Sequence, residues 1–429
     1  MKIINNPNRT DWPTLVTRPE FKKEEITIVV SEILSEVKNN GDEALLKYAE
    51  KFDQVKLSQL TVSKEEIENA TSVVSEELKS AIEIAKSNIE KFHSAQNTSE
   101  APVETTKGVS CWRKSVGIEK VGLYIPGGSA PLFSTILMLA IPAKIAGCKE
   151  IILCTPPNKE GQINPAILYT AKLVGITNIF KVGGAQAVGA MAWGTETIPQ
   201  VYKIFGPGNQ FVTKAKEMVQ QEGVAIDMPA GPSELLVIAD DSCNPSFVAA
   251  DLLSQAEHGA DSQVILLSDS EKVLAEVNAE LDFQLAQLPR IEIAKAAIEN
   301  SKSILLSNIN DCLEFSNQYA PEHLILASVK TDEMINKIVN AGSVFIGNYS
   351  CESAGDYASG TNHTLPTNGF ARNYSGVSVD SFVKKITFQK LNETGIQNIG
   401  SAIEIMADAE GLFAHKNAVT LRLKEIGDV

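Results

Sequence analysis

The sequence predicts an α/β fold with two Rossmann-like, doubly wound lobes whose sheets are largely parallel, preceded by N-terminal helices and followed by a C-terminal helical tail. Three observations support this prediction. The first hundred residues have helical periodicity, short apolar runs alternate with helical runs from residue 119 to about 375, and the alternation then stops. So many alternating units favour two lobes rather than one, and 429 residues of 44% apolar composition suffice for two sizeable cores.

The first hundred residues contain two amphipathic helical runs. Residues 26–52 carry apolar side chains at helical spacing, with a break at Asn39-Asn40-Gly41-Asp42. Ser63-Lys64-Glu65-Glu66 resembles a capping box and opens a second run with one apolar stripe. His93 falls at the charged end of that run, where we expect a solvent-exposed helix residue.

From residue 119 the pattern changes to βα units, which are typical of parallel sheets. Each predicted strand is a short apolar run, and each of the first four is followed by a helical run. The predicted strands are 121–125, 151–154, 179–182, 202–205, 235–238, 263–267 and 323–326, and the helical runs are 134–146, 165–174, 185–193 and 210–221.

The clearest boundary candidate is the turn-rich segment 227–233, which separates two alternating blocks. Residues 377–429 have an amphipathic pattern, typical of a tail that docks on its own body or on another subunit. We therefore expect an N-terminal arm (1–20), the helical start of a first lobe (21–118), a second α/β lobe (119–234), the remainder of the first lobe (235–375) and a C-terminal tail (376–429).

Composition and charge exclude several classes of protein. A net charge of −15 argues against nucleic-acid binding, which needs clustered Lys and Arg. The most apolar stretch, residues 135–143, is too short to span a bilayer, and the polar residues 1–12 are no signal peptide. We expect a soluble, cytoplasmic protein with no membrane partner. Its six cysteines include no C-x-x-C pair, which argues against thiolate zinc sites and for reduced thiols.

Three Gly-rich turns follow predicted strands in the second lobe: Pro126-Gly127-Gly128, Gly183-Gly184-Ala185-Gln186 and Gly206-Pro207-Gly208-Asn209. In α/β sheets such turns lie where helix N-termini and free backbone N–H groups attract anions. None matches G-x-G-x-x-G, so a standard dinucleotide fingerprint is absent. Tight turns that need glycine for backbone reasons would explain each one singly, but three in one block favour a ligand cleft.

Four of the five histidines lie after residue 257, each near a carboxylate or a glycine: His258, His323, His363 and His415. Imidazole is suited to both metal ligation and proton transfer near neutral pH. Residues 246–260 are predicted to form a helix on which Gln255 and His258 share the face away from the apolar stripe. Two ligands at this spacing would be a usable metal geometry, and a surface histidine is the simpler alternative.

Two further polar segments are candidates for chemistry. Glu322-His323 places an acid beside a base after Pro321, where a predicted strand begins. The loop 353–363 is dense in polar side chains, and its apolar flanks favour a cleft mouth over an ordinary surface loop. Its polar residues are Ser353, Asp356, Ser359, Thr361, Asn362 and His363.

Taken together, these segments resemble those of the L-histidinol dehydrogenases. The matching segments follow the order of that family and cover most of the chain from 120 to 420, whereas the first hundred residues match in pattern only. The segments are 124–134, 183–186, 205–209, 227–234, 254–259, 320–324, 353–366 and 410–415.

The resemblance implies an oxidoreductase that converts L-histidinol through L-histidinaldehyde to L-histidine, the final steps of histidine biosynthesis, with NAD and one zinc ion per site. It implies four zinc ligands: Gln255, His258, Asp356 and His415. Chemistry alone would not favour glutamine, since zinc usually takes Cys, His or carboxylate ligands. A zinc ion that holds the imidazole and amine of the substrate would position it more than generate a nucleophile from water.

The implied chemistry needs a base twice. His323 suits removal of the hydroxyl proton, and Glu322 suits activation of the water that adds to the aldehyde. In addition to these bases and the zinc ligands, the resemblance implies substrate contacts from Ser233, His363 and Glu410. It assigns NAD to the second lobe, at positions on or beside the Gly-rich turns: Tyr124, Gln186 and Asn209.

The resemblance also implies a homodimer in which the C-terminal tail crosses to the partner. Glu410 and His415 would then complete the partner's site. The separation of the tail from the α/β body fits this arrangement, but the sequence does not distinguish a crossing tail from one that folds back.

Other functions remain open at this point. An aldehyde-dehydrogenase-like mechanism would form a thiohemiacetal on a cysteine, with Cys148 or Cys351 as candidates. A zinc hydrolase could use the same metal ligands to bind a water molecule. A metal-binding module without activity would leave Glu322 and His323 without a role, and a dehydrogenase for another amino alcohol should lack the imidazole-specific site.

Overall fold

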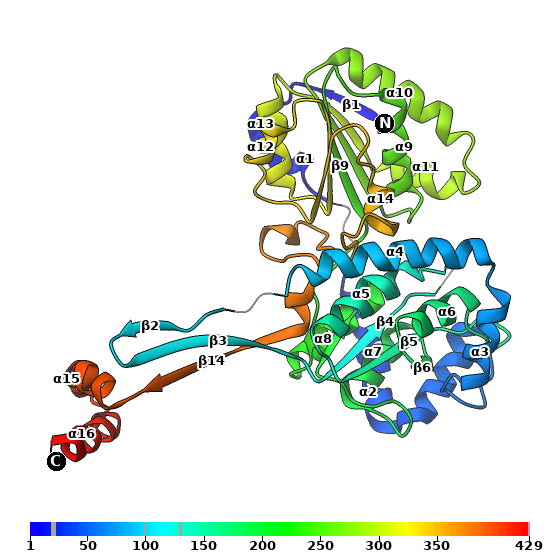
Figure 1. Cartoon of the computed structure of the whole chain (residues 1–429). Coiled ribbons are helices and arrows are strands. Elements are labelled where there is room, and N and C mark those ends of the chain that lie inside the picture. Colours follow the sequence, from blue (N-terminus) through cyan, green and yellow to red (C-terminus); the bar gives the residue numbers. More distant parts are fainter. Residues whose placement is uncertain (19–22, 98–99, 128–130, 428–429) are drawn as a thin grey trace.

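The chain forms two α/β lobes, one above the other in Figure 1, with a long arm that projects from the lower lobe. The computed structural model describes residues 1–18, 23–97, 100–127 and 131–427. Gly128 of the first Gly-rich turn therefore lies outside the described residues, as do residues 19–20 of the expected N-terminal arm. We call the lower body the N-terminal lobe and the upper body the C-terminal lobe.

The N-terminal lobe is built on a parallel sheet of five strands in the order β6-β5-β4-β7-β8. The first strand along the chain is central and the chain winds outward on both sides, which is the doubly wound topology. Its strands are β4 (Lys120–Tyr124), β5 (Glu150–Thr155), β6 (Asn178–Lys181), β7 (Lys203–Phe205) and β8 (Ala225–Ile226), and its crossover helices are α5 (Ser134–Ile145), α6 (Pro165–Leu173), α7 (Gly184–Trp193) and α8 (Gln210–Gln221).

The N-terminal helices cover this same sheet, so their expected place in the lobe of residues 235–375 is wrong. Val30 and Ile33 share a core with Ile152 and Val188, and Ile67 and Ile89 share a second core with Leu123 and Leu153. A parallel sheet is apolar on both faces and needs helices on each, and these helices supply part of that cover. The helices are α2 (Lys23–Tyr48), which continues into the π-helix η2 (Ala49–Asp53), α3 (Lys64–Val73) and α4 (Glu76–Ser94).

Local signals in this region are confirmed, but the expected exposure of His93 is wrong. Gly41 has non-helical backbone angles (φ 51°, ψ −130°) at the predicted break, and Ser63 and Glu66 form the predicted capping box. His93 is fully buried. Its Nδ1 lies 3.0 Å from Gln96 Oε1 and its Nε2 lies 3.4 Å from Asn362 Nδ2, because the distant loop of residues 359–364 covers this end of α4.

The C-terminal lobe has a parallel sheet in the order β1-β11-β10-β9-β12-β13. Strands β9 to β13 repeat the doubly wound order of the first sheet, and β1 from the N-terminal arm adds at the edge beside β11. The strands are β1 (Lys2–Asn5), β9 (Glu234–Ala239), β10 (Gln263–Ser268), β11 (Lys302–Leu305), β12 (His323–Ala327) and β13 (Ser343–Ile346). The fold class predicted from the sequence is confirmed.

Helices cover both faces of this second sheet and connect its strands. The helices are α1 (Trp12–Leu15), α9 (Pro245–Ala256), α10 (Glu271–Leu285), α11 (Ile291–Glu299), α12 (Ile309–Tyr319), α13 (Asp332–Ile335) and α14 (Glu352–Tyr357), with the 3-10 turns η1 (Arg9–Asp11) and η3 (Phe370–Arg372). The 3-10 turn η4 (Val379–Phe382) packs instead in the core of the N-terminal lobe.

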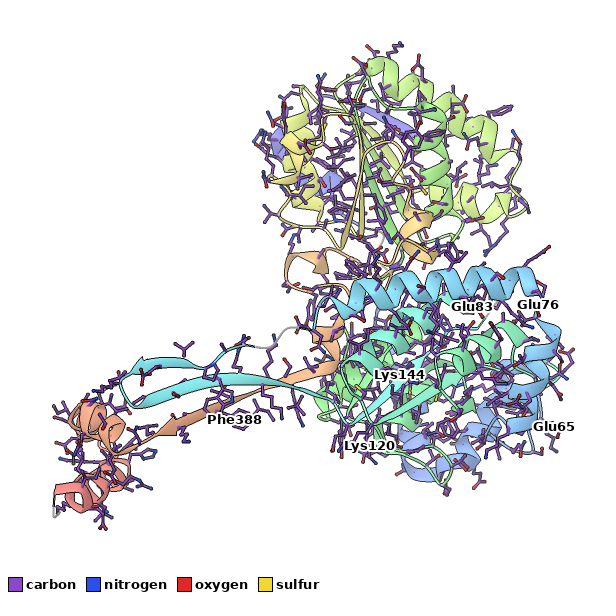
Figure 2. The ribbon with its side chains drawn as sticks, viewed as in Figure 1. Glu65, Glu76, Glu83, Lys120, Lys144 and Phe388 are labelled. Atoms are coloured by element: carbon purple, nitrogen blue, oxygen red, sulfur yellow. The ribbon has the colours of Figure 1, made fainter. Side chains whose placement is uncertain are left out.

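The arm is a three-stranded antiparallel sheet that ends in a helical hairpin (Figure 1). Trp112 and Phe388, which is labelled in Figure 2, stack across two of its strands with ring centroids 5.4 Å apart. The sequence predicted an amphipathic tail but no strands, and it placed residues 103–117 in the helical start. The elements are β2 (Val103–Thr106), β3 (Val109–Gly117), β14 (Val383–Leu391), α15 (Glu393–Ala409) and α16 (Phe413–Gly427).

Among the described helices, none combines the length and the apolarity needed to cross a membrane. All six cysteines are free thiols.

Candidate functional site

The start of β12 places the acid–base pair of the sequence side by side in the interior. Glu322 is 6% exposed and His323 is 4% exposed. The backbone of Glu234, the first residue of β9, holds both of them, because β9 and β12 are neighbours in the sheet. The Glu234 N–H donates to Glu322 Oε2 at 2.8 Å, and the Glu234 carbonyl oxygen lies 3.3 Å from His323 Nδ1.

Burial and charge set the proton affinity of this pair. Burial raises the pKa of Glu322 to about 7. Burial alone would lower the pKa of His323, but the negative charges of Glu352, Glu322 and Asp356 outweigh it and raise that pKa to about 10. The second ring nitrogen of His323 faces Asp356 Oδ1 at 3.6 Å and has no hydrogen-bond partner among the described residues. A polar nitrogen without a partner in the interior is available to a ligand.

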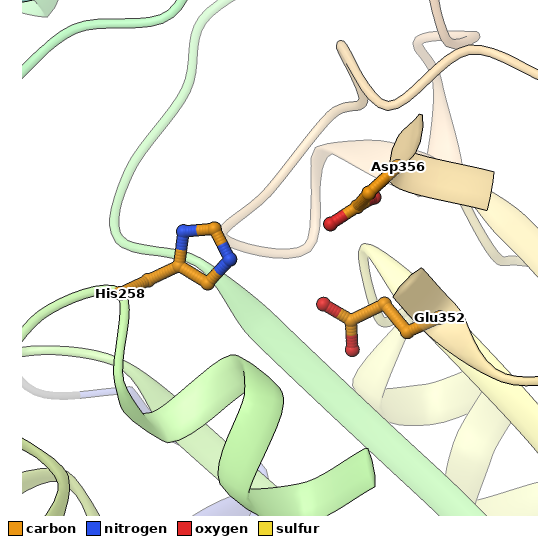
Figure 3. Close-up of side chains that lie close together, drawn as sticks. All are labelled: His258, Glu352 and Asp356. Atoms are coloured by element: carbon orange, nitrogen blue, oxygen red, sulfur yellow. The ribbon is translucent and has the colours of Figure 1, made fainter. Parts of the chain in front are cut away.

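Three side chains beside this pair form a candidate metal centre. One ligand atom each from His258, Glu352 and Asp356 lie within 4.8 Å of one another, and Figure 3 shows the three side chains pointing toward a common space. Glu352 is 1% exposed, and burial first of all raises its pKa well above the usual range. Glu352 Oε2 and Asp356 Oδ1 are buried without a hydrogen-bond partner among the described residues. Such unpaired acceptors suit a cation.

Gln255 lies at the same centre but not on a solvent-facing helix face. Helix α9 ends at Ala256, so His258 follows in the turn beyond it, while Gln255 is 1% exposed. The Gln255 amide oxygen faces Glu352 Oε1, and the amide nitrogen lies 3.4 Å from Glu322 Oε2. Half a turn of the amide would let the nitrogen donate to Glu352 and the oxygen accept from the Glu234 N–H at 2.8 Å.

Three of the four late histidines converge on Asp356. Burial alone would raise the pKa of Asp356, but His323, His363 and His258 act in the opposite direction and lower it. His363 also connects the lobes, since its Nε2 lies 3.5 Å from Ser134 Oγ at the start of α5. Ser233 directly precedes β9 and is therefore adjacent to the Glu234 backbone that contacts the pair.

Two predicted site residues are not at this centre within the chain. Glu410 lies at the end of α15 and His415 lies in α16, in the helical hairpin at the far end of the arm (Figure 1). The hairpin exposes large apolar side chains: Ile405, Met406 and Phe413 are 64–69% exposed. Apolar exposure of this extent indicates an interaction surface.

The three predicted cofactor residues line one cavity of 690 Å³ at the carboxyl edge of the N-terminal sheet. Tyr124 ends β4 and its hydroxyl accepts from the Gly184 N–H at 3.2 Å, Gln186 lies in the first turn of α7, and Asn209 caps α8. Gly206 has φ 129°, and an added Cβ would lie 2.0 Å from the Tyr124 carbonyl oxygen. The turn therefore needs glycine, because a side chain here would overlap the Tyr124 backbone.

A short segment of chain, residues 131–134, links the cavity to His363 at the candidate metal centre. Pro131 lines the cavity, and Ser134, three residues later, contacts His363. Asn362 donates to the Met138 carbonyl oxygen in α5 at 2.7 Å and fixes the same loop. A ligand in the cavity would thus border the centre where the lobes meet.

Sequence reasoning missed Glu352. Its spacing from Asp356, four residues apart on α14, places both carboxylates on one helix face and could have identified it.

Of the two cysteine candidates, Cys351 caps α14 beside Glu352. Cys148 lies near the Phe382 carbonyl oxygen, just before β5 and at the sheet edge opposite the cavity, and burial raises its pKa to about 11.

Comparisons with known proteins identify the family of this chain. Residues 16–423 match the family described as histidinol dehydrogenase. The histidinol dehydrogenase of Bacteroides thetaiotaomicron is 60% identical over 426 residues, covering 99% of this chain and 100% of the relative, and that of Escherichia coli K12 is 52% identical, covering 96% and 95%. The crystal structure of the Elizabethkingia anophelis histidinol dehydrogenase matches at a TM-score of 0.98 with 60% identity, covering 100% of this chain and 99% of that chain. The chain therefore belongs to the histidinol dehydrogenase family.

Proposed function

We propose that this protein oxidises L-histidinol to L-histidine through L-histidinaldehyde, with NAD as hydride acceptor and one zinc ion in each site. The observation that carries the proposal is the buried Glu322–His323 pair beside the cluster of His258, Glu352 and Asp356. Zinc, when bound, would supply a Lewis-acidic point that holds the imidazole and amine of the substrate.

The residues present fit a cation. His258 and Asp356 supply one nitrogen and one oxygen ligand, which are donors that zinc accepts. Gln255 lies beside these groups, with its side-chain amide in contact with Glu352 and Glu322. On the family resemblance, we assign Gln255, His258 and Asp356 as ligands within the chain and His415 of a second copy as the fourth, and Glu352 lies in the same cluster beside Gln255.

The two bases act at different proton-transfer steps. The neutral form of His323, which a cation bound at Asp356 would favour, can donate Nδ1–H to the Glu234 carbonyl oxygen, and this leaves Nε2 free to take the hydroxyl proton of the substrate in the first oxidation. Glu322 Oε2 is held by the Glu234 N–H, and its carboxylate takes the proton of the water that adds to the aldehyde in the second oxidation. Ser233, His363 and Glu410 would contact the substrate around this pair.

The cavity of the N-terminal lobe suits NAD. It lies at the carboxyl edge of a doubly wound sheet, where the first turn of α7, which has no side-chain cap, offers backbone N–H groups to a pyrophosphate. Among the described residues that line it, Asp53 is the single charged side chain. Tyr124, Gln186 and Asn209 are the proposed contacts, and no lining Lys or Arg is present in the described residues for an additional phosphate.

The arm would carry Glu410 and His415 to the site of a second copy. Its helical hairpin lies away from the centre of its own chain and exposes apolar side chains (Figure 1). The test is complementation between His415→Ala and His258→Ala chains, each of which we expect to be inactive alone. If the tails cross, a mixed dimer has one site with both histidines intact and regains part of the activity. Mixing that restores nothing would show that each chain completes its own site.

The stoichiometry of the reaction tests the function itself. We expect two NADH for each L-histidinol consumed, with activity lost on chelation and restored by zinc. One NADH would mean that the enzyme stops at the aldehyde, and no NADH would leave a zinc hydrolase as the better assignment. Cys351→Ala should keep turnover, and a loss equal to that of Glu322→Gln would favour the cysteine mechanism.

A further inference from the structure

Arg18 makes a buried, bidentate ion pair behind the catalytic pair. Its Nε lies 2.5 Å and its Nη2 lies 2.8 Å from the two carboxylate oxygens of Glu234. The Arg18 side chain is 13% exposed and that of Glu234 is 3% exposed. A bidentate guanidinium–carboxylate contact fixes orientation as well as charge, and one at this depth is costly to break.

The same guanidinium also holds the chain that leads into β12. Arg18 Nη2 donates to the Tyr319 carbonyl oxygen at 2.8 Å and lies 3.4 Å from that of Ala320. Its central carbon lies 3.9 Å from the centre of the Tyr319 ring. Ala320 has a left-handed backbone (φ 54°), which is unfavourable for a residue with a Cβ and needs support from its surroundings.

Arg18 therefore joins the two strand starts that carry the chemistry. Glu234 begins β9 and contacts Glu322 and His323 through its backbone N–H and carbonyl, while its carboxylate binds Arg18 and accepts from the Asn368 N–H at 2.8 Å. Ala320 lies two residues before Glu322. A shift of the start of β9 or of the segment that leads into β12 would move the Glu322 carboxylate or the His323 imidazole.

We propose that Arg18, contributed by the N-terminal arm, is a positioning residue that holds the Glu322–His323 pair in its reactive geometry through Glu234, Tyr319 and Ala320. The proposal rests on the proposed catalytic roles of Glu322 and His323. Arg18 itself does not touch the substrate, and its effect is on the turnover of bound substrate rather than on binding.

The test compares Arg18→Ala and Arg18→Lys with Arg9→Ala. Arg9 is the matched control because it lies on the same N-terminal arm (residues 1–20) as Arg18 but pairs at the surface with Asp311 and Glu314. We expect kcat per folded molecule to fall roughly 10- to 100-fold in Arg18→Ala, less in Arg18→Lys and not at all in Arg9→Ala. The KM values for L-histidinol and NAD and the bound zinc should stay near those of the parent protein.

A purely structural role predicts a different result. It would lower the melting temperature and the folded fraction, while kcat per folded molecule stayed unchanged, and that outcome would overturn the proposal. A loss confined to KM, or one shared equally by Arg9→Ala, would overturn it as well. If Arg18→Ala does not fold, Arg18→Lys and Glu234→Gln provide the same comparison of kcat with KM.

Glu322→Gln and His323→Asn separate this proposal from the one on which it rests. If both variants keep full turnover, the catalytic roles are wrong whatever Arg18 does. If both lose turnover while the Arg18 variants keep it, only the positioning role is wrong.

Discussion

The two lobes share one strand order but present their functional residues at opposite edges of their sheets. In the N-terminal lobe the 690 Å³ cavity lies at the carboxyl ends of the strands. In the C-terminal lobe Glu234 and His323 are the first residues of β9 and β12, so the candidate active site lies at the amino edge. The carboxyl edge of that second sheet has a separate 530 Å³ cavity lined by Asp240, Asp241 and Asp269.

The difference follows from the direction of the helices. In a βα unit the helix N-terminus lies at the carboxyl edge of the sheet and favours anions, whereas the helix C-terminus lies at the amino edge and favours cations. The N-termini of α7 and α8 face the cavity, and Gln255 and His258 come from the C-terminal end of α9. One topology thus suits a pyrophosphate at one edge and a metal ion at the other.

The amino edge of the C-terminal sheet should carry the largest effects. We expect Glu322→Gln and His323→Asn to lower kcat by about 100- to 10,000-fold, because each removes a proton-transfer group. Rates of NADH formation should be measured with L-histidinol and, separately, with L-histidinaldehyde. Glu322→Gln should be most defective with the aldehyde, and equal defects of both variants on both substrates would contradict the division of roles.

Zinc binding should also depend on one edge only. We expect His258→Ala to weaken zinc binding roughly 10- to 100-fold or more, measured as bound zinc after dialysis against a graded chelator. Asp241→Asn, at the carboxyl edge of the same sheet, is the matched control and should leave bound zinc unchanged. Equal zinc loss from both variants would place the metal elsewhere.

Local patterns predicted most of the fold, and long-range contacts account for what they missed. The seven predicted strands between residues 121 and 326 and the capping box at Ser63 were confirmed, because each depends on neighbours within one element, whereas β8 and β11 in the same range were not predicted. The partner sheet of the N-terminal helices was wrong and the strands of the arm were not predicted, since both depend on tertiary pairing. Residue spacing alone does not determine such contacts.

The candidate site likewise has residues that a local sequence pattern indicated and residues that no local pattern indicated. Glu322-His323 stood out as an acid beside a base, whereas Gln255 as a ligand came only from family resemblance. Arg18 gave no signal, because it lies 216 positions from Glu234 and no local pattern connects them. The ligand set and the cofactor contacts named from the sequence stay predictions until they are tested.

At the carboxyl edge of the N-terminal sheet, Asp53 should determine the choice between NAD and NADP. Burial raises the pKa of this carboxyl to about 6, and at neutral pH its negative charge would repel the additional phosphate of NADP. We expect Asp53→Asn to lower the ratio of kcat/KM for NAD to that for NADP by about tenfold. The ratio should stay unchanged in Glu50→Gln, an exposed carboxylate of the same π-helix, and a ratio unaffected in both variants would contradict the role of Asp53.

The smallest expected effect is at Tyr124. Its hydroxyl accepts from the Gly184 N–H, so Tyr124→Phe leaves that N–H without this partner while the ring still fills the cavity wall. The proposed contact of this hydroxyl with NAD is lost as well, and a hydrogen bond of about 1 kcal/mol corresponds to a rise of about fivefold in the KM for NAD. The KM for L-histidinol and the bound zinc should not change, because both belong to the amino edge of the other sheet. A Tyr124→Phe variant that lost zinc or bound L-histidinol less tightly would show that the two edges form one functional unit rather than two.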